Sequence, residues 1–137
     1  MKKLIAILLL VPVLVLGQSN KPKRDFVELN VGMADTWMIG WFPGVSSLWG
    51  RTIQYDNGTV GEYQIGLALP SVVTAKVGVG LGNLDNNVML AIRPFPLTIG
   101  PQVKLGVLTF SAELGTNETV SFDAHLIFTA GIRIKVK

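Results

Sequence analysis

The sequence predicts an all-β protein: an antiparallel meander of about eight strands after a cleaved signal peptide, with a closed barrel favoured over a sandwich. Three observations carry this prediction. Residues 119–137 alternate between apolar even positions and mostly polar odd positions, the pattern of a long strand with two unlike faces. Shorter segments with the same alternation recur along the chain, separated by short turn-forming sequences. No segment of the mature chain has the three- and four-residue apolar spacing of an amphipathic helix.

The N-terminal segment predicts export. Lys2 and Lys3 precede the apolar run 4–16, which is followed by Gly17. We expect a signal peptide over 1–17, a lead-in over 18–25 and a single β-barrel-like domain over 26–137. A retained membrane anchor is the alternative, but a spanning helix needs about 20 apolar residues and this run is shorter. The chain has no cysteine, so neither disulfides nor a lipid anchor on cysteine is expected.

The charge of the mature chain does not indicate a nucleic-acid-binding surface. Of the 12 Lys and Arg residues, Lys2 and Lys3 leave with the signal peptide, so 10 remain against 9 Asp and Glu and the net charge is about +1. A nucleic-acid-binding surface needs cations clustered on one face. We therefore expect no nucleic-acid partner.

The first half of the mature domain is expected to contain strands at 26–33, 51–55 and 59–69. Asn57-Gly58 is the preferred pair for a two-residue type I′ turn, because both central residues need positive φ. Residues 34–50 hold all three tryptophans and lose the alternation, so a loop at one rim is expected, with at most a short strand at 38–42. Aromatic side chains there suit a membrane interface or a ligand-binding rim, and a small hydrophobic cluster under a loop is the alternative. These rim aromatics are Trp37, Trp41, Phe42 and Trp49.

The second half continues the meander, with strands at 73–81 and from 88 joined by the turn-forming residues 82–87. The prolines of 94–96 and the pair Gly100-Pro101 are expected to interrupt regular pairing.

A change of phase and a hairpin are expected near the end of the chain. The apolar positions change phase between Val107 and Leu108, which predicts a β-bulge within one strand. The last hairpin is expected to turn on three residues, 116–118 or 115–117, because Ala112 and Val120 must share one face.

The alternating pattern leaves two arrangements open. The apolar faces can point inward, as in a soluble sandwich or barrel, or outward into lipid around a polar interior. The apolar faces are long and nearly free of charge, which favours the membrane arrangement. The 82–87 hairpin sets Lys76 opposite Arg93, and such like charges require a carboxylate from a facing strand. The predicted interior polar network consists of Glu28, Glu62, Lys76, Arg93, Lys104, Glu113, Asp123, His125 and Arg133.

Several stretches resemble known proteins. The cleavage region Leu16-Gly17-Gln18 is similar to signal peptides of the flavobacterial group. The runs 91–96 and 99–102 and the ending 128–133 resemble strands of small outer-membrane β-barrel proteins of that group. This resemblance covers roughly the second half of the chain and implies an outer-membrane location. Such barrels usually end in an aromatic residue read by the insertion machinery, whereas this chain ends in 135–137, Lys-Val-Lys.

Catalysis is not predicted. One histidine and no cysteine provide no zinc site of the usual kind. Asp123 and His125 share a face, but any two residues two apart on a strand do so, and no serine in a strained turn accompanies them. The glycine-rich run 78–82 precedes no helix that would bind phosphate. We expect no catalytic residue, no cofactor and no metal.

The sequence therefore predicts a small outer-membrane β-barrel with a structural or surface role, and membrane lipid as its partner. The alternative is a secreted or periplasmic β-sandwich or lipocalin-like barrel that binds a small apolar ligand, with the tryptophan-rich loop as its mouth. No protein partner is indicated.

Overall fold

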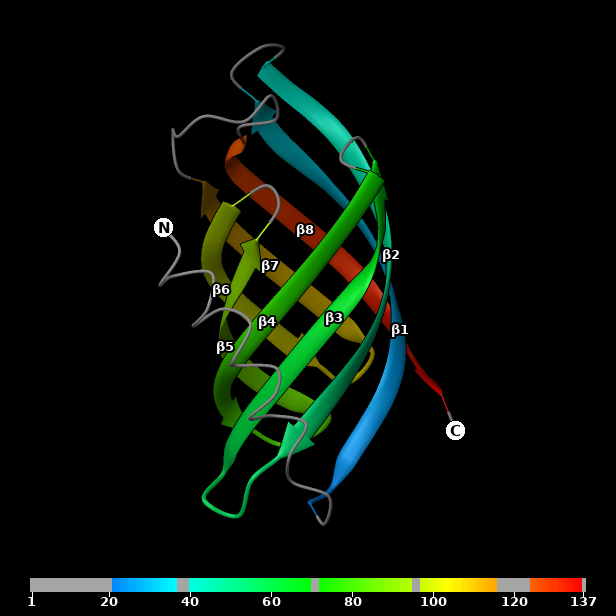
Figure 1. Cartoon of the computed structure of the whole chain (residues 1–137), viewed down its shortest axis with the longest axis vertical. Helices are drawn as coiled ribbons and strands as arrows, with labels where there is room; N and C mark the ends of the chain where they lie inside the picture. Colours follow the sequence, from blue (N-terminus) through cyan, green and yellow to red (C-terminus); the bar gives the residue numbers. More distant parts are fainter. Residues whose placement is uncertain (1–20, 37–39, 70–71, 95–96, 116–123, 137) are drawn as a thin grey trace.

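The computed structural model describes residues 21–36, 40–69, 72–94, 97–115 and 124–136. They form a closed antiparallel barrel in which each strand pairs with its neighbours in sequence and β8 pairs with β1 (Figure 1). The predicted eight-stranded antiparallel barrel is confirmed. In the described part of the chain, no helix is long and apolar enough to cross a membrane. The strands are β1 (Lys23–Thr36), β2 (Gly40–Gln54), β3 (Thr59–Leu69), β4 (Val72–Gly82), β5 (Asn86–Pro94), β6 (Leu97–Leu105), β7 (Leu108–Gly115) and β8 (Ala124–Val136).

The strands are strongly staggered around the barrel. A path across paired residues that starts at Asp25 in β1 crosses every strand in turn and returns to β1 at Asp35, ten residues further along. Such a stagger requires strands tilted by roughly 35–45° to the barrel axis, and Figure 1 shows this tilt. With eight strands, the lumen is just wide enough for side chains to fill it. A site in the lumen is therefore built from side chains that meet across the barrel.

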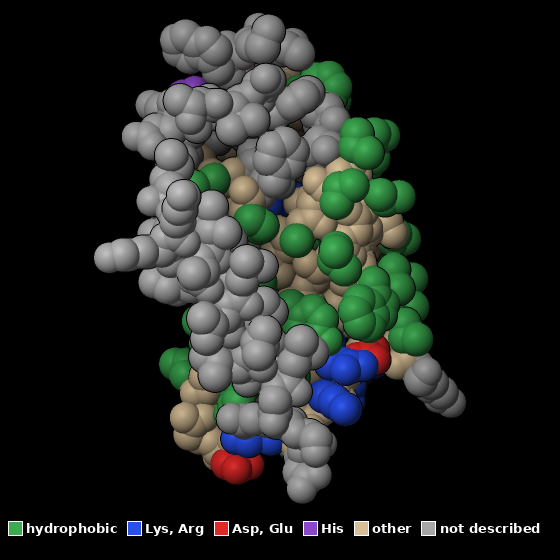
Figure 2. Space-filling view, in the orientation of Figure 1, with side chains coloured by type: hydrophobic (Ala, Val, Ile, Leu, Met, Phe, Trp, Pro, Cys, Tyr) green, Lys and Arg blue, Asp and Glu red, His purple; other side chains and the backbone are tan. Residues whose placement is uncertain are grey.

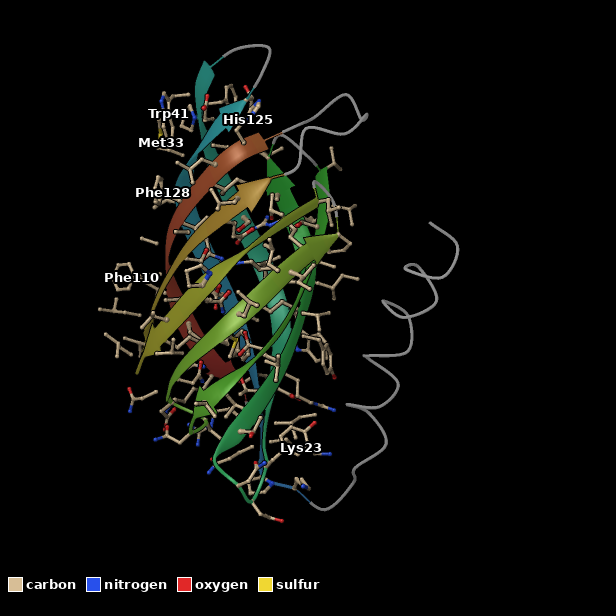
Figure 3. The ribbon with its side chains drawn as sticks, turned by 90° about the vertical axis from the view of Figure 1, so that its left-hand side faces the viewer. Lys23, Met33, Trp41, Phe110, His125 and Phe128 are labelled. Carbon is tan, nitrogen blue, oxygen red and sulfur yellow. The ribbon has the colours of Figure 1, made fainter. Side chains whose placement is uncertain are left out.

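Successive side chains alternate between the lumen and the outer surface. On β1, Glu28 and Asn30 are buried, whereas Leu29 and Val31 are 49% and 62% exposed. The burial of β5 and β6 alternates in the same way along most of their length. Figure 3 shows Phe110 projecting outward from the barrel wall. The outer surface is therefore largely apolar, and the buried side of the wall carries most of the polar residues.

The two ends of the barrel differ. The turns 55–58, 83–85 and 106–107 lie at one end, which we call the turn end. Lys23, where β1 begins, lies at the turn end, and His125 lies toward the opposite end (Figure 3). The chain therefore enters and leaves the barrel at the turn end.

The expected loop over 34–50 is wrong. β1 continues to Thr36 and β2 begins at Gly40, with Pro43 opposite Met33. The described ladder between β2 and β3 begins at Val45, so Pro43 occupies a stretch of β2 where no donor to β3 is needed. The tryptophans of this segment that the structure describes therefore lie on a strand.

The change of phase near Val107 is a hairpin turn and not a β-bulge. Leu105 pairs with Leu108, so Gly106 and Val107 form a two-residue connection between β6 and β7. Residues that flank a two-residue turn face the same way, which shifts the parity of the apolar positions by one. Gly106 has a φ of +60°, which glycine adopts without steric cost. At Gly100-Pro101 the strand itself continues and both residues pair with β5, but the ladder to β7 omits them, so the expected interruption of pairing occurs on that side only.

Two further hairpins differ from prediction, one in loop length and one in register. The amide of Tyr55 donates to the carbonyl of Thr59, so the loop enclosed by this pair, residues 56–58, has three residues and not two. Gly58 in this loop has a φ of +77°, as expected for a turn that ends in a left-handed residue. Between β7 and β8, Leu114 pairs with Leu126, so the predicted position of the turn, at 115–117 or 116–118, is wrong, although the predicted even parity holds. Residues 116–123 lie outside the described part.

Candidate functional site

The charged residues predicted for the polar faces converge in the lumen. Seven of the nine have buried side chains, one from each strand except β2: Glu28, Glu62, Lys76, Arg93, Lys104, Glu113 and Arg133. His125 is half-buried toward the end opposite Lys23 (Figure 3). Asp123 lies outside the described residues. The barrel therefore contains a buried network of charges drawn from nearly its whole circumference.

One cluster of this network is centred on Glu113. Arg93 donates to both carboxylate oxygens, from Nε at 2.9 Å and from Nη2 at 3.2 Å. The Nζ of Lys76 lies 2.6 Å from Oε1, and the hydroxyl of Thr98 donates to Oε2 at 2.6 Å. Ser111 donates to the same carboxylate at 3.2 Å. Glu113 therefore compensates two buried cations at once.

This cluster was anticipated from strand pairing. Leu81 pairs with Val88, and the ladder continues to Val77 with Ile92, as the sequence predicted. Lys76 and Arg93 lie one step beyond, on the lumen side. The expectation that a carboxylate from a facing strand would lie within salt-bridge reach of one of them is confirmed.

A second cluster is centred on Lys104. Its Nζ lies 2.5 Å from Oε1 of Glu62 and 3.2 Å from Oε2 of Glu28, and the Lys104 side chain is fully buried. Gln102 connects the two clusters, because its Oε1 accepts a hydrogen bond from Lys76 at 3.0 Å and its Nε2 donates to Glu62 at 3.3 Å. The clusters thus form one continuous hydrogen-bonded system.

Among the described residues, the buried cations in the lumen outnumber the buried carboxylates by one. Arg133, which is 2% exposed, has no carboxylate partner among the described residues. Its Nη2 donates to the carbonyl oxygens of Asp85 and Gly106, both at 2.8 Å. Its guanidinium carbon lies 5.4 Å from the centre of the Phe26 ring, within the range of a cation–π interaction. Arg133 is therefore held by carbonyls and an aromatic face.

Glycines on the lumen side allow the backbones of neighbouring strands to lie close together and leave space for the side chains of the network. A Cβ added at Gly66, Gly80 or Gly100 would overlap a backbone carbonyl oxygen of the neighbouring strand. The outward Gly61 differs, because a Cβ there would meet only the ring of Tyr55 at 3.4 Å. Close approach of the strands on the inside therefore depends on glycine.

The cavities differ between the lumen and the outer surface. Beside Arg93 lies a cavity of about 70 Å³, whose lining includes the small inward residues Gly32 and Gly44. It could hold a few water molecules, whereas pockets for small-molecule ligands occupy about 300–1,000 Å³. A hollow of about 830 Å³ lies on the outer surface, and its lining includes Leu29, Val31, Val45, Leu69 and Phe110. The described lumen therefore does not resemble the apolar cup expected of a lipocalin-like barrel.

The two tryptophans of β2 lie along its outer face. Trp41 stacks on Phe128, with ring centres 6.3 Å apart and planes at 13°. Trp49, eight residues nearer the turn end, meets Tyr63 edge-on at 6.1 Å. In Figure 3, Trp41 and Phe128 lie toward the end opposite Lys23. The described tryptophans thus occupy two levels of the apolar surface.

Other residues of the site were missed or lie elsewhere. Phe42 is half-buried on the lumen side of β2, and Trp37 lies outside the described residues. The neutral members of the network, Gln64 and Gln102 among them, were not predicted. Both share a face of their strand with a predicted charged residue, and this parity is the signal that would have identified them.

Among the described residues, no group of three or more His, Asp or Glu side chains could hold a metal ion. Comparison with protein-family models, with curated proteins and with solved structures gives no match.

Proposed function

We propose that this chain is a small outer-membrane β-barrel with a structural or surface role and no catalytic activity. One observation carries the proposal: 26 large apolar side chains of the described residues are exposed, while charged side chains from seven strands are buried in the lumen. Soluble monomers rarely expose a contiguous apolar patch larger than a few hundred Å². Membrane barrels combine an apolar outer band with a polar interior.

The dimensions of the strands support the same proposal. A strand that crosses a bilayer needs about 9–11 residues at a tilt near 45°, and the strands here have 8 to 15 residues. In Figure 2, hydrophobic side chains are spread over the right-hand part of the outer wall, and most of the charged side chains in view lie near its lower end. Trp41 and the Trp49–Tyr63 pair suit the aromatic belts found at the two membrane interfaces.

The proposal includes an orientation. Outer-membrane barrels keep their short turns on the periplasmic side, so the turn end would face the periplasm. The end that carries His125 and lies near Trp41 would then face the exterior. A surface role would belong to that end, and the filled lumen would not pass large solutes.

The soluble alternative has less support. A lipocalin-like barrel would need an apolar lumen, but the lumen is occupied by Glu113, Lys104 and their partners. Its apolar outer surface would also have to be covered by another molecule.

Fractionation of a Gram-negative host that expresses the full chain tests the proposal. We expect the protein in the outer-membrane fraction, released only by detergent and migrating differently on a gel before and after heating. A soluble periplasmic enzyme serves as the control for leakage between fractions. Recovery of the folded protein from the periplasm without detergent would contradict the proposal.

A further inference from the structure

Asp85, in the turn between β4 and β5, is contacted from several other parts of the barrel. Its carboxylate pairs with Arg24 of β1 and with Nζ of Lys135 of β8, the latter at 2.9 Å. Its carbonyl oxygen accepts hydrogen bonds from Nη2 of Arg133 at 2.8 Å and from the amide of Gly106 at 3.1 Å. We call this set of contacts the Asp85 bridge.

The bridge crosses the mouth of the barrel. β1 and β8 are the strands whose pairing closes the barrel, and we call that pairing the seam. In the order of strands, the β4–β5 turn lies half-way round the barrel from the seam. Arg24, Lys135 and Arg133 all belong to the seam strands, so each of their contacts with Asp85 spans the opening at the turn end.

We propose that the Asp85 bridge is an acid-sensitive set of ion pairs and hydrogen bonds. It keeps the β4–β5 turn over the mouth of the barrel and links this turn to the seam. A single carboxylate serves both Arg24 and Lys135, so one proton removes the partner of two cations. The Asp85 side chain is 38% exposed, and solvent protons can reach it. This inference does not rest on the proposed membrane location, because the bridge forms within one chain.

The direction of the pH dependence follows from the groups around Asp85. Hydrogen bonds from Lys135 and Arg24 hold the pKa of the Asp85 carboxyl below its ordinary value. Arg133 of β8 faces the backbone of Asp85, and the β6–β7 turn contributes the neutral amide of Gly106. A lowered pKa contributes stability that is fully present above the ordinary pKa, near 4, and is lost as the pH falls through the lowered value. The bridge should therefore hold at neutral pH and fail in acid.

Amide hydrogen exchange of the folded full chain tests the inference. Asp85→Asn keeps the shape of the side chain but removes the charge that both cations share. At neutral pH we expect protection to fall about tenfold at Gly106 and at the turn-end residues of β1 and β8, because hydrogen bonds to charged groups are lost. Protection in the middle of the barrel should not change.

Asp56→Asn is the matched control, because Asp56 lies in another turn at the same end and its ion-pair partner among the described residues, Lys21, is 3.9 Å away. This variant should leave protection at Gly106 and at the seam unchanged. Equal exchange in the Asp85→Asn and Asp56→Asn variants would overturn the inference.

The unmodified chain provides a second measurement that requires no variant to fold. Between pH 7 and pH 3, protection factors corrected for intrinsic exchange should fall first at Gly106 and the turn end of the seam, with the central barrel still protected. No change over this range, or a simultaneous loss throughout the barrel, would also overturn the inference.

Discussion

Substitution of Glu113 by Gln should be strongly destabilising. The change preserves size but removes the charge that compensates Lys76 at 2.6 Å and Arg93 at 2.9 Å. The side chains of these cations are only 4% and 7% exposed, so bulk solvent cannot take the place of the carboxylate. Breaking a buried ion pair by removing one partner costs about 3–5 kcal/mol. Total folding free energies are about 5–15 kcal/mol, so this single change should remove a large part of the stability.

Urea unfolding in detergent micelles, followed by tryptophan fluorescence, measures the effect. Adding Lys76→Met to Glu113→Gln removes one of the two cations that have lost their carboxylate partner, so the double variant should be more stable than the sum of the single effects implies. We expect a coupling energy of about 1–3 kcal/mol from the complete cycle. The pair Lys21 and Asp56, in which the Asp56 side chain is 94% exposed, is the control, with an expected coupling of about 0.2–1 kcal/mol or less.

Two outcomes would refute this reasoning. The first is a cost below about 1 kcal/mol for Glu113→Gln, the level of an ordinary exposed pair. The second is a Lys76–Glu113 coupling no larger than that of the control pair. Either would mean that water screens the charges of the lumen.

Two further predictions concern the wall of the barrel. Gly100→Ala should lower the free energy of unfolding by about 1–3 kcal/mol, because the new Cβ would overlap the backbone of β7. Gly61→Ala should be close to neutral. Urea midpoints compare the two variants, and equal midpoints would contradict the packing argument. Leu90→Arg, at the centre of β5 on the outer face, should lower the free energy of unfolding in lipid vesicles by about 2–4 kcal/mol. Leu81→Arg, near the turn end, should lower it by about 0–1 kcal/mol. Equal losses of stability in the two variants would argue against burial of Leu90 in lipid.

The alternation of residues predicted the strands and their faces well where both faces were distinct. At the 82–87 hairpin, apolar residues on both sides fixed the register, and this placed Lys76 beside Arg93 correctly. A one-residue slip would have moved every apolar side chain into the lumen. The carboxylate that joins them could not be identified from sequence, because Glu113 reaches the pair across the barrel and the stagger of the strands is needed to place it.

The strand predicted at 51–55 is the end of β2, but the stretch of β2 from Gly40 to Gly50 could not be predicted, for a physical reason. Its lumen side carries Gly44, Ser46 and Gly50, small residues that a narrow lumen requires, and its outer side carries Pro43 and Ser47 among the tryptophans. A pattern based on apolar against charged residues therefore disappears in this strand, although the period of two remains.

The parity of the β6–β7 connection was equally ambiguous. A two-residue hairpin and a β-bulge both shift the apolar positions by one, so parity alone could not separate them. Gly106, with its positive φ, was the residue that favoured a turn.

The contact of the outer wall with lipid is tested most directly by spin labels on single cysteines. The natural chain has no cysteine, so Leu90→Cys on β5, Ile132→Cys on β8 and Asn57→Cys in a turn each provide one labelling site. After reconstitution in vesicles, labels at 90 and 132 should collide with oxygen more than with a water-soluble nickel complex, and the label at 57 should show the reverse. Nickel access at 90 and 132 equal to that at 57 would contradict a lipid-facing wall.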